Sequence, residues 1–465
     1  MTDRFERDDG PGPSDGLRPT WSRSSRPFPR NVVQPLQAFL QTESSSAILL
    51  LAATVVALAW ANSPLGDGYD RFWGTELTVR LGSRVLSDDL RGWVSDGLMT
   101  VFFFVVGLEI KRELVTGELR DRRRAALPVV AAIGGMLVPA AIFLAFTAGT
   151  PAARGFGIAM PTDIVFVLAV LTLAPRVPVG LKAMLLTLAI VDDLGSIGIV
   201  AFFYADHVDP APLVVALAIF VAFAALWRIG VRAPVVYVAL GVASWVALDV
   251  AGIAPTLAGV VLAFLTPAAA FQRPRHVSDE ARRVADLTLD EPVPPDADAA
   301  EWLDLARLSR ETVSPLARAE TLLLPWSSFV IVPLFALANA GVRFSAHAAA
   351  DALTQPLGLG ILVSRVVGKP LGIALAVLLA LRLGLGVLPE GLRRGHLAAA
   401  GVLAGIPFTV SLFVAELALP ASLVEPATIA ILLAAVLAGL LGTFLLRLGG
   451  GRDEPARGAV PPQVS

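Results

Sequence analysis

The chain has 465 residues, of which 55% are hydrophobic and 16% are charged, and its mean hydropathy is +0.70. A soluble domain of this length cannot bury so much apolar surface, whereas repeated apolar runs of about 20 residues match a bilayer core. The net charge of −2 indicates no nucleic acid or other polyanionic partner, and the lack of cysteine excludes disulfides and thiolate metal sites. The composition therefore predicts an all-α polytopic membrane protein without a cofactor.

Hydropathy divides the chain into two polar tails and an apolar body. Residues 1–44 lack the apolar core of a signal peptide, so we expect a disordered cytoplasmic tail. We expect residues 45–447 to form the transmembrane domain and residues 448–465 to form a second cytoplasmic tail. About twelve spans are predicted, at 45–62, 92–110, 125–148, 155–174, 180–204, 211–228, 234–249, 253–270, 321–341, 356–381, 396–418 and 427–447.

Positive charges alternate between successive short loops. The loops of one set carry Lys111, Arg112, Arg120, Arg122, Arg123, Arg124, Arg176, Lys182, Arg228, Arg232, Arg382, Arg393 and Arg394. The other set carries Arg154 and is bare of Lys and Arg at 205–210, 250–252 and 419–426. Because cytoplasmic loops are enriched in Lys and Arg, both termini are predicted to lie on the cytoplasmic side of a bacterial inner membrane.

Two longer connections differ from the short loops. In residues 71–90, Leu77, Val79 and Leu81 alternate with polar residues before a Gly-Ser pair, which predicts a small β-hairpin on the outer side. Residues 272–318 form a long polar insert on the cytoplasmic side. Its composition favours a flexible surface linker.

Two adjacent carboxylates, Asp192 and Asp193, lie in the middle of an apolar span. A charged residue at a helix centre costs about 2.5–3.5 kcal/mol on the mildest scale, so the pair costs about 5–7 kcal/mol. Neighbouring helical residues point about 100° apart. We therefore expect one carboxylate to reach a water-filled cavity and the other to meet a buried cation. A protonated, hydrogen-bonded pair without a transport role is the alternative.

Asp163 follows a predicted helix break. Pro161 lacks a backbone donor and disfavours helix at Met160, so we expect the span to be interrupted just before Thr162. A carboxylate at the start of the resumed helix offsets its positive end, and the Thr162 hydroxyl adds an oxygen that could contact an ion. A purely structural helix cap is the alternative for Asp163.

Lys369 lies inside another apolar span, where an ammonium requires an acidic partner or must lose its proton. A lysine that snorkels to the interface is the alternative, although the nearest end of the span is some distance away. Arg365, one turn earlier, is closer to the outer end of the span. We predict that Arg365 snorkels.

A second interrupted span occurs in the last third of the chain, where Gly401, Gly405 and Pro407 disfavour a continuous helix. Broken spans in corresponding places of two halves are typical of transporter binding sites. If the two broken helices cross, like ends face each other. Asp163 is then expected to neutralise the paired N-terminal ends, and Lys369 the paired C-terminal ends.

Seven short motifs are distributed along the apolar body. They are GLEIKREL (107–114), PVVAAIGGMLVPA (128–140), PTDI (161–164), LAIVDDLGSI (188–197), TLAGV (256–260), PLFALANAGV (333–342) and GKPLGI (368–373). With these motifs the chain resembles the NhaA family of sodium/proton antiporters over about residues 45–447. The resemblance implies twelve helices, inverted repeats and two unwound helices that cross at mid-membrane. This family is among the examples behind the rule on broken spans, so the two arguments overlap.

The resemblance implies roles for the buried charges. By motif match, Asp193 and Asp192 would bind Na⁺ and H⁺, whereas Asp163 and Lys369 would compensate the charges of the helix ends. Lys369 is also implied to form a salt bridge with Asp192. The family further suggests a homodimer through the hairpin at 71–90.

The resemblance also implies a regulatory region. Glu109 and Glu113, one turn apart at the cytoplasmic end of the second span, and Glu320 match a family region tied to pH regulation. Ordinary interfacial charges are the alternative for these residues. The chain departs from the family at two histidine positions, occupied here by Ala254 and Thr321, and at Pro407, where glycine is usual. The long insert is a further departure.

Competition for one site explains how such a chain could couple two ions. Burial raises the pKa of a carboxyl towards cytoplasmic pH, so protons and Na⁺ exclude each other. If the site opens to one side at a time, entry of external H⁺ drives export of cytoplasmic Na⁺, which would serve sodium and pH homeostasis. Li⁺ is expected to fit a small oxygen-lined site, and K⁺ to fit less well.

Other functions remain as alternatives. A sodium-coupled solute symporter of related fold would need a roomier polar pocket for an organic substrate. A passive channel would show no dependence of cation flux on an opposing proton gradient. An intramembrane aspartyl protease is disfavoured, because adjacent aspartates diverge on a helix and no GxGD pattern is present. We therefore predict a transporter and not an enzyme.

Overall fold

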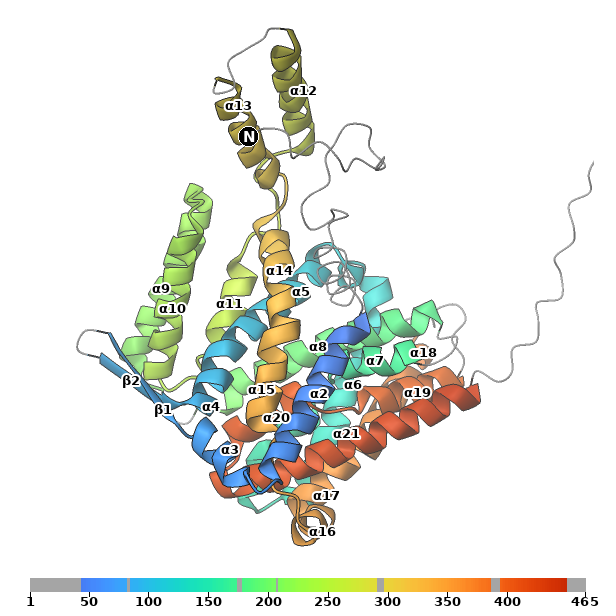
Figure 1. Cartoon of the computed structure of the whole chain (residues 1–465). Helices are drawn as coiled ribbons and strands as arrows, with labels where there is room; N and C mark the ends of the chain where they lie inside the picture. The colour runs from blue at the N-terminus through green and yellow to red at the C-terminus, as the bar shows by residue number, and fades with distance from the viewer. Residues whose placement is uncertain are drawn as a thin grey trace, which may run out of the picture.

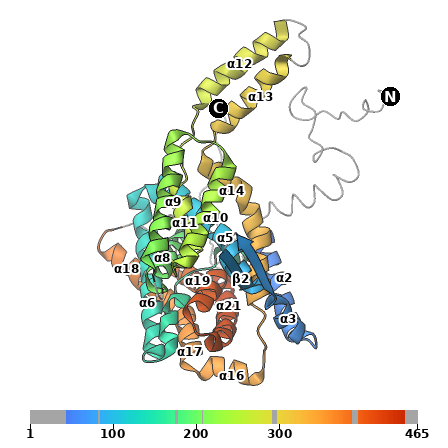
Figure 2. The ribbon, with the colours of Figure 1, turned by 90° about the vertical axis from the view of Figure 1, so that its left-hand side faces the viewer.

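A computed structural model describes residues 43–81, 84–173, 178–205, 208–290, 297–385 and 394–449, so most of both predicted tails lies outside it. These residues form a helical body with one two-stranded sheet (Figures 1 and 2). Within them, seven helices are long and apolar enough to cross a membrane, or up to ten if each of three bent pairs counts as one span. The predicted all-α membrane fold is confirmed.

Several spans consist of successive helical segments. The long spans are α4 (Leu90–Gly92), η3 (Trp93–Leu98) and α5 (Met99–Val115); α6 (Arg122–Thr147); α8 (Val179–Phe203); α9 (Pro210–Ile229); α14 (Pro315–Trp326), η6 (Ser327–Ile331) and α15 (Val332–Asn339); α17 (Pro356–Val363), η7 (Ser364–Gly368) and α18 (Lys369–Arg382); and α21 (Ala421–Gly449). The segments η3, η6 and η7 are π-helical. Such local widening inside α-helices is frequent at functional sites.

Three helix pairs are bent at short breaks. They are α2 (Glu43–Ala61) with α3 (Gly66–Trp73), the 3₁₀ helix η5 (Pro151–Ala159) with α7 (Ile164–Leu173), and α19 (Arg394–Ala404) with α20 (Thr409–Ala418). The bends are 114°, 43° and 43°. The remaining predicted spans, 234–249 and 253–270, correspond to the shorter apolar helices α10 (Pro234–Val250) and α11 (Leu257–Leu265). Two further short helices are η4 (Glu118–Arg120) and α16 (Ala346–Thr354).

The predicted β-hairpin is confirmed. Strands β1 (Glu76–Leu81) and β2 (Arg84–Asp89) pair antiparallel, with Glu76 opposite Asp89. The indole of Trp93 donates a hydrogen bond to the Leu77 carbonyl over 2.8 Å. This bond ties the hairpin to the start of the second span.

The prediction of a flexible linker for the insert is wrong. The insert contains α12 (Pro274–Asp290) and α13 (Ala297–Glu311), which pack against each other and stand away from the helical body (Figures 1 and 2). Val277 and Val284, seven residues apart on one face of α12, are buried, so the segment has an apolar stripe that polar composition concealed. An ion pair between Arg232 and Glu311 joins the end of α13 to the body.

Contacts between loops define two sides of the body. On one side, which we call the hairpin side, Asn62 donates to the Val342 carbonyl over 2.8 Å, and Arg343 pairs with Asp67 and Asp70. On the opposite side, which we call the insert side, the ammonium of Lys111 donates to the carbonyls of Phe264 and Thr266 at the end of α11. These contacts bring together the loops after the first and ninth predicted spans, and the ends of the second and eighth.

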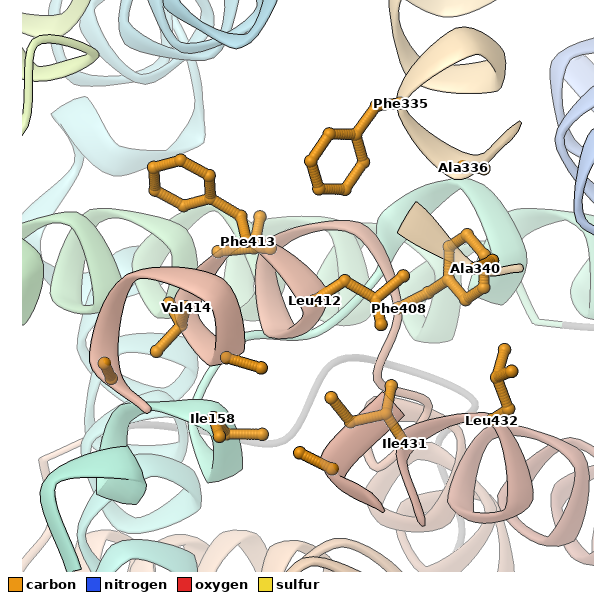
Figure 3. Packing of buried hydrophobic residues seen from close by; sticks show 14 of the residues in the cluster. Ile158, Phe335, Ala336, Ala340, Phe408, Leu412, Phe413, Val414, Ile431 and Leu432 are labelled. Atoms are coloured by element: carbon orange, nitrogen blue, oxygen red, sulfur yellow. The ribbon is translucent and has the colours of Figure 1, made fainter. Parts of the chain in front are cut away.

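Close approach between helices holds the site-bearing segments in place. A Cβ at Gly134 of α6 would lie 2.5 Å from the Gly372 carbonyl of α18, so only glycine permits this contact. Helix α20 is likewise surrounded: Leu412 and Phe413 lie near Phe335 of α15, while Ile158 and Ile431 lie on its other flank (Figure 3). The buried residues of η5 and α20 therefore belong to the largest buried cluster of the described residues, whereas those of α19 and most of α7 belong to a second cluster.

Candidate functional site

The two breaks that join η5 to α7 and α19 to α20 meet in the interior. The Asp163 amide donates to the Ile406 carbonyl over 3.1 Å, and the Thr162 hydroxyl donates to the Ala404 carbonyl over 2.8 Å. Unwound backbone at membrane depth needs such partners, because lipid offers none. The predicted crossing of the two broken helices is thus present.

Asp163 caps two helices at once. Its Oδ1 accepts from the Phe166 amide of α7 over 3.2 Å, and its Oδ2 accepts from the Thr409 amide of α20 over 3.1 Å. The Thr409 hydroxyl donates to the same Oδ2 over 2.9 Å. Both helices present their positive N-terminal ends to one buried carboxylate, so Asp163 lies where it was expected to neutralise them.

The opposite ends of the break are met by cations. The Lys369 ammonium donates to the Met160 carbonyl, and the Arg365 guanidinium donates to the Ala159 and Pro161 carbonyls. The Ala159 carbonyl belongs to the last residue of η5, and the Met160 and Pro161 carbonyls follow directly, at the end where the helix dipole is negative. Lys369 thus donates at the end of η5, whereas the Ala404 carbonyl that ends α19 accepts from Thr162.

Arg365 does not snorkel, which corrects our prediction. Its side chain is fully buried, and Nη2 also donates to the Ser411 hydroxyl of α20 over 2.7 Å. Ser411 in turn donates to the Ile158 carbonyl over 3.1 Å. The spacing of four residues to Lys369 was the available signal, since residues i and i+4 share a helix face.

Asp192 and Lys369 form an ion pair from α8 to α18. The carboxylate Oδ2 and the ammonium Nζ lie 2.5 Å apart, and neither side chain is exposed. The Thr162 hydroxyl also lies 2.7 Å from the same oxygen, so its single proton is shared between Asp192 and the Ala404 carbonyl, while Oδ1 accepts no hydrogen bond from the described residues. Asp192 is thus the carboxylate of the pair that contacts a buried cation, as we expected for one of the two. The salt bridge implied by the resemblance is present.

Asp193 has no such cation partner among the described residues. It is 6% exposed, and its Oδ1 accepts no hydrogen bond from them. It follows Asp192 on one helix, so the two carboxylates point in different directions. Around the crossing, the three buried aspartates face two buried cations, Arg365 and Lys369, which leaves one carboxylate in excess.

A second charged group lies on the insert side. Arg112 of α5 pairs with Glu320 of α14, and it lies 3.9 Å from Glu109 and 3.5 Å from Glu113. The structure therefore brings together the three glutamates that the family resemblance assigned to one region. Thr321, next to Glu320, donates its hydroxyl to the Ala317 carbonyl of its own helix over 2.8 Å.

Comparison with known proteins relates this arrangement to a family. The sequence profile described as Na⁺/H⁺ antiporter 1 matches residues 37–446. The chain belongs to this family. Among its relatives, Na⁺/H⁺ antiporter NhaA 3 of Frankia alni is 43% identical over 93% of this chain and 94% of its own length. The NhaA antiporter of Anaeromyxobacter sp. is 45% identical over 93% and 95%, respectively. NhaA 2 of Sorangium cellulosum is 43% identical over 92% of both chains. These relatives are antiporters by name, so they give the solute-symporter alternative no support.

Proposed function

We propose that this member of the Na⁺/H⁺ antiporter 1 family exchanges cytoplasmic Na⁺ for external H⁺ across a bacterial inner membrane. The observation that carries the proposal is the carboxylate in excess at the crossing of the broken helices. A buried negative charge without a counterion is strongly unfavourable. The site is therefore stable when it holds one monovalent cation or one proton.

Asp193 is the residue at which the two ions compete. Asp192 is held by Lys369 and Thr162, whereas an oxygen of Asp193 has no donor among the described residues. Binding of Na⁺ and protonation both neutralise Asp193, so each excludes the other. Exchange follows if the site is open to one side of the membrane at a time.

The neighbouring residues keep the crossing intact while the ion changes. Asp163 compensates two helix N-termini, and Arg365 compensates the C-terminal end of η5 together with Lys369. Arginine keeps its charge under all conditions. Of the two buried cations, Lys369 is therefore the one that can follow a change in the charge of Asp192. Arg365 continues to hold the Ala159 and Pro161 carbonyls.

The site is suited to a small hard cation. Its side-chain oxygens come from Asp192, Asp193 and Thr162, and hard cations prefer oxygen ligands. Li⁺ should therefore replace Na⁺, and K⁺ should bind less well. The alternation of Lys and Arg favours placing the insert side in the cytoplasm.

Two expectations from the resemblance complete the proposal. The group formed by Arg112, Glu109, Glu113 and Glu320 would set the pH range of exchange. The hairpin of β1 and β2 would join two copies of the chain. Oxidative crosslinking of a Thr78→Cys variant in membranes should give a dimer, and recovery of monomer alone would argue against this interface.

Everted membrane vesicles test the exchange directly. After a proton gradient is built up inside them, addition of Na⁺ or Li⁺ should dissipate it in the wild type, and K⁺ should have little effect. The Asp193→Asn variant should show no dissipation, whereas Asp279→Asn, on the exposed insert, should behave as the wild type. No response of the wild type to Na⁺ at any pH would contradict the proposed function.

A further inference from the structure

A separate group of polar side chains, two of them buried and one partly buried, lies near the hairpin side. Glu416, in the last turn of α20, accepts a hydrogen bond at Oε2 from the Ser95 hydroxyl of η3 over 2.8 Å. The Asn339 amide, at the end of α15, donates from Nδ2 to the same hydroxyl over 3.0 Å. Three segments distant in the sequence thus contribute three neighbouring side chains.

One buried atom of this group lacks a hydrogen-bond partner among the described residues. Ser95 is 8% exposed and Asn339 is 9% exposed, yet the Asn339 Oδ1 accepts no hydrogen bond from the described residues. Because Nδ2 of the same amide bonds Ser95, Oδ1 lies beside the group. A buried carbonyl oxygen requires a donor or a cation.

The electrostatic setting favours a cation. The C-terminal end of a helix is negative, so Glu416 occupies a position where a carboxylate is disfavoured. The charged side chains that act on it are, in order of effect, Arg91, Asp96 and Asp89. A bound positive ion would offset both the helix end and the acidic side chains.

The group lies between the crossing and the hairpin side along α20. Thr409, which bonds Asp163, and Glu416 are seven residues apart on α20, so they share a helix face and lie about 10 Å apart along it. Phe413 lies between them, and its ring packs against Phe103 with centroids 5.1 Å apart. An apolar contact therefore separates the group from the central aspartates.

We propose that Glu416, Ser95 and Asn339 form a second Na⁺ site, which holds the ion between the central aspartates and the solution on the hairpin side. The carboxylate, hydroxyl and amide oxygens are the ligand types that hard cations prefer. This site rests on the proposed function, because it receives the Na⁺ that exchange delivers. It gives the hairpin side its own affinity for Na⁺, separate from that of Asp193.

Exchange of labelled Na⁺ measured from each side tests this site. Right-side-out and everted vesicles loaded with unlabelled Na⁺ take up ²²Na⁺ through the hairpin side and the insert side, respectively. Glu416→Gln should raise the half-saturating Na⁺ concentration about tenfold from the hairpin side, because a charged ligand is lost. From the insert side it should stay within about twofold of the wild type.

Two further variants make the result decisive. Asn339→Leu removes the unpaired oxygen at similar size, and it should also weaken Na⁺ on the hairpin side alone; it decides the matter if Glu416→Gln does not fold. Glu425→Gln, an exposed carboxylate on the same side, should change neither value. Unchanged hairpin-side saturation, or equal shifts from both sides, would overturn the second site while leaving the antiporter intact. Wild-type vesicles without any Na⁺ exchange would instead contradict the proposed function, and the second site with it.

Discussion

The ammonium of Lys369 and the carboxylate of Asp192 lie 2.5 Å apart, and neither side chain is exposed. Thr162 and the Met160 carbonyl supply further hydrogen bonds to the pair. Both charges have been removed from water, so their stability depends on each other and on these few partners. The pair also joins α8 to α18, next to the break in the η5–α7 segment.

Loss of Lys369 should leave Asp192 without a counterion. Lys369→Ala leaves the Asp192 carboxylate buried without a cation, and we expect the free energy of unfolding to fall by about 3–5 kcal/mol. The double variant Lys369→Gln with Asp192→Asn should recover much of this loss, because no charge is then unpaired. Thermal unfolding in detergent measures both. Equal stability of Lys369→Ala and the wild type would show that the pair contributes nothing.

Replacing Asp193 should abolish exchange with little loss of stability, whereas replacing Asp192 should lower both. Because Asp193 has no cation partner among the described residues, Asp193→Asn should change the free energy of unfolding by no more than about 1 kcal/mol while abolishing exchange. Asp192→Asn leaves Lys369 unpaired and should lower stability as well as exchange. Unfolding curves and vesicle fluxes recorded on the same preparations separate the two effects. A large stability loss in Asp193→Asn alone would assign Asp193 a structural role.

Arg365 should be essential to the shape of the crossing. Arg365→Leu leaves the Ala159 and Pro161 carbonyls without their donor, at a cost of about 1–3 kcal/mol for each buried group. Ser411→Ala removes one of the partners of Arg365 and should cost less, at about 1 kcal/mol. Unfolding measurements rank the two variants. The reverse order would mean that Arg365 is not what holds the end of η5.

The case of Arg365 shows where sequence reasoning succeeds and where it ends. Proline and glycine positions predicted both helix breaks. The free-energy cost of a charge in lipid identified Asp163, Asp192 and Lys369 as candidate site residues. Neither argument gives the depth of a residue near a span end. Arg365 was assigned to the interface, but the π-helical segment Ser364–Gly368 and the crossing place it fully inside.

The prediction of a flexible linker for the insert failed for a different reason. Overall polarity favoured a linker, and this measure ignores periodicity. Val277 and Val284 form an apolar stripe on α12 that only a test at helical spacing detects. The group of Glu416, Ser95 and Asn339 was missed because its members come from three spans, and no local pattern connects them.

The charged group around Arg112 should govern the pH range of exchange. Glu320→Gln removes the carboxylate in closest contact with Arg112, which then pairs more fully with Glu109 and Glu113. We expect a displaced pH profile with a maximal rate within about twofold of the wild type. Glu311→Gln, whose partner is Arg232, is the matched control and should keep the original profile. Superimposable profiles for Glu320→Gln and the wild type would remove this group from regulation.

Competition between Na⁺ and H⁺ at Asp193 is the central claim, and calorimetric titration of the purified chain with Na⁺ at a series of pH values tests it most directly. Where the competing proton is bound, each fall of one pH unit should weaken Na⁺ binding about tenfold, because one proton must leave for each ion that binds. The Asp193→Asn variant should bind no Na⁺ at the central site, whereas Asp279→Asn should titrate as the wild type does. A dissociation constant that does not change with pH, or an undiminished heat of binding in Asp193→Asn, would contradict the account.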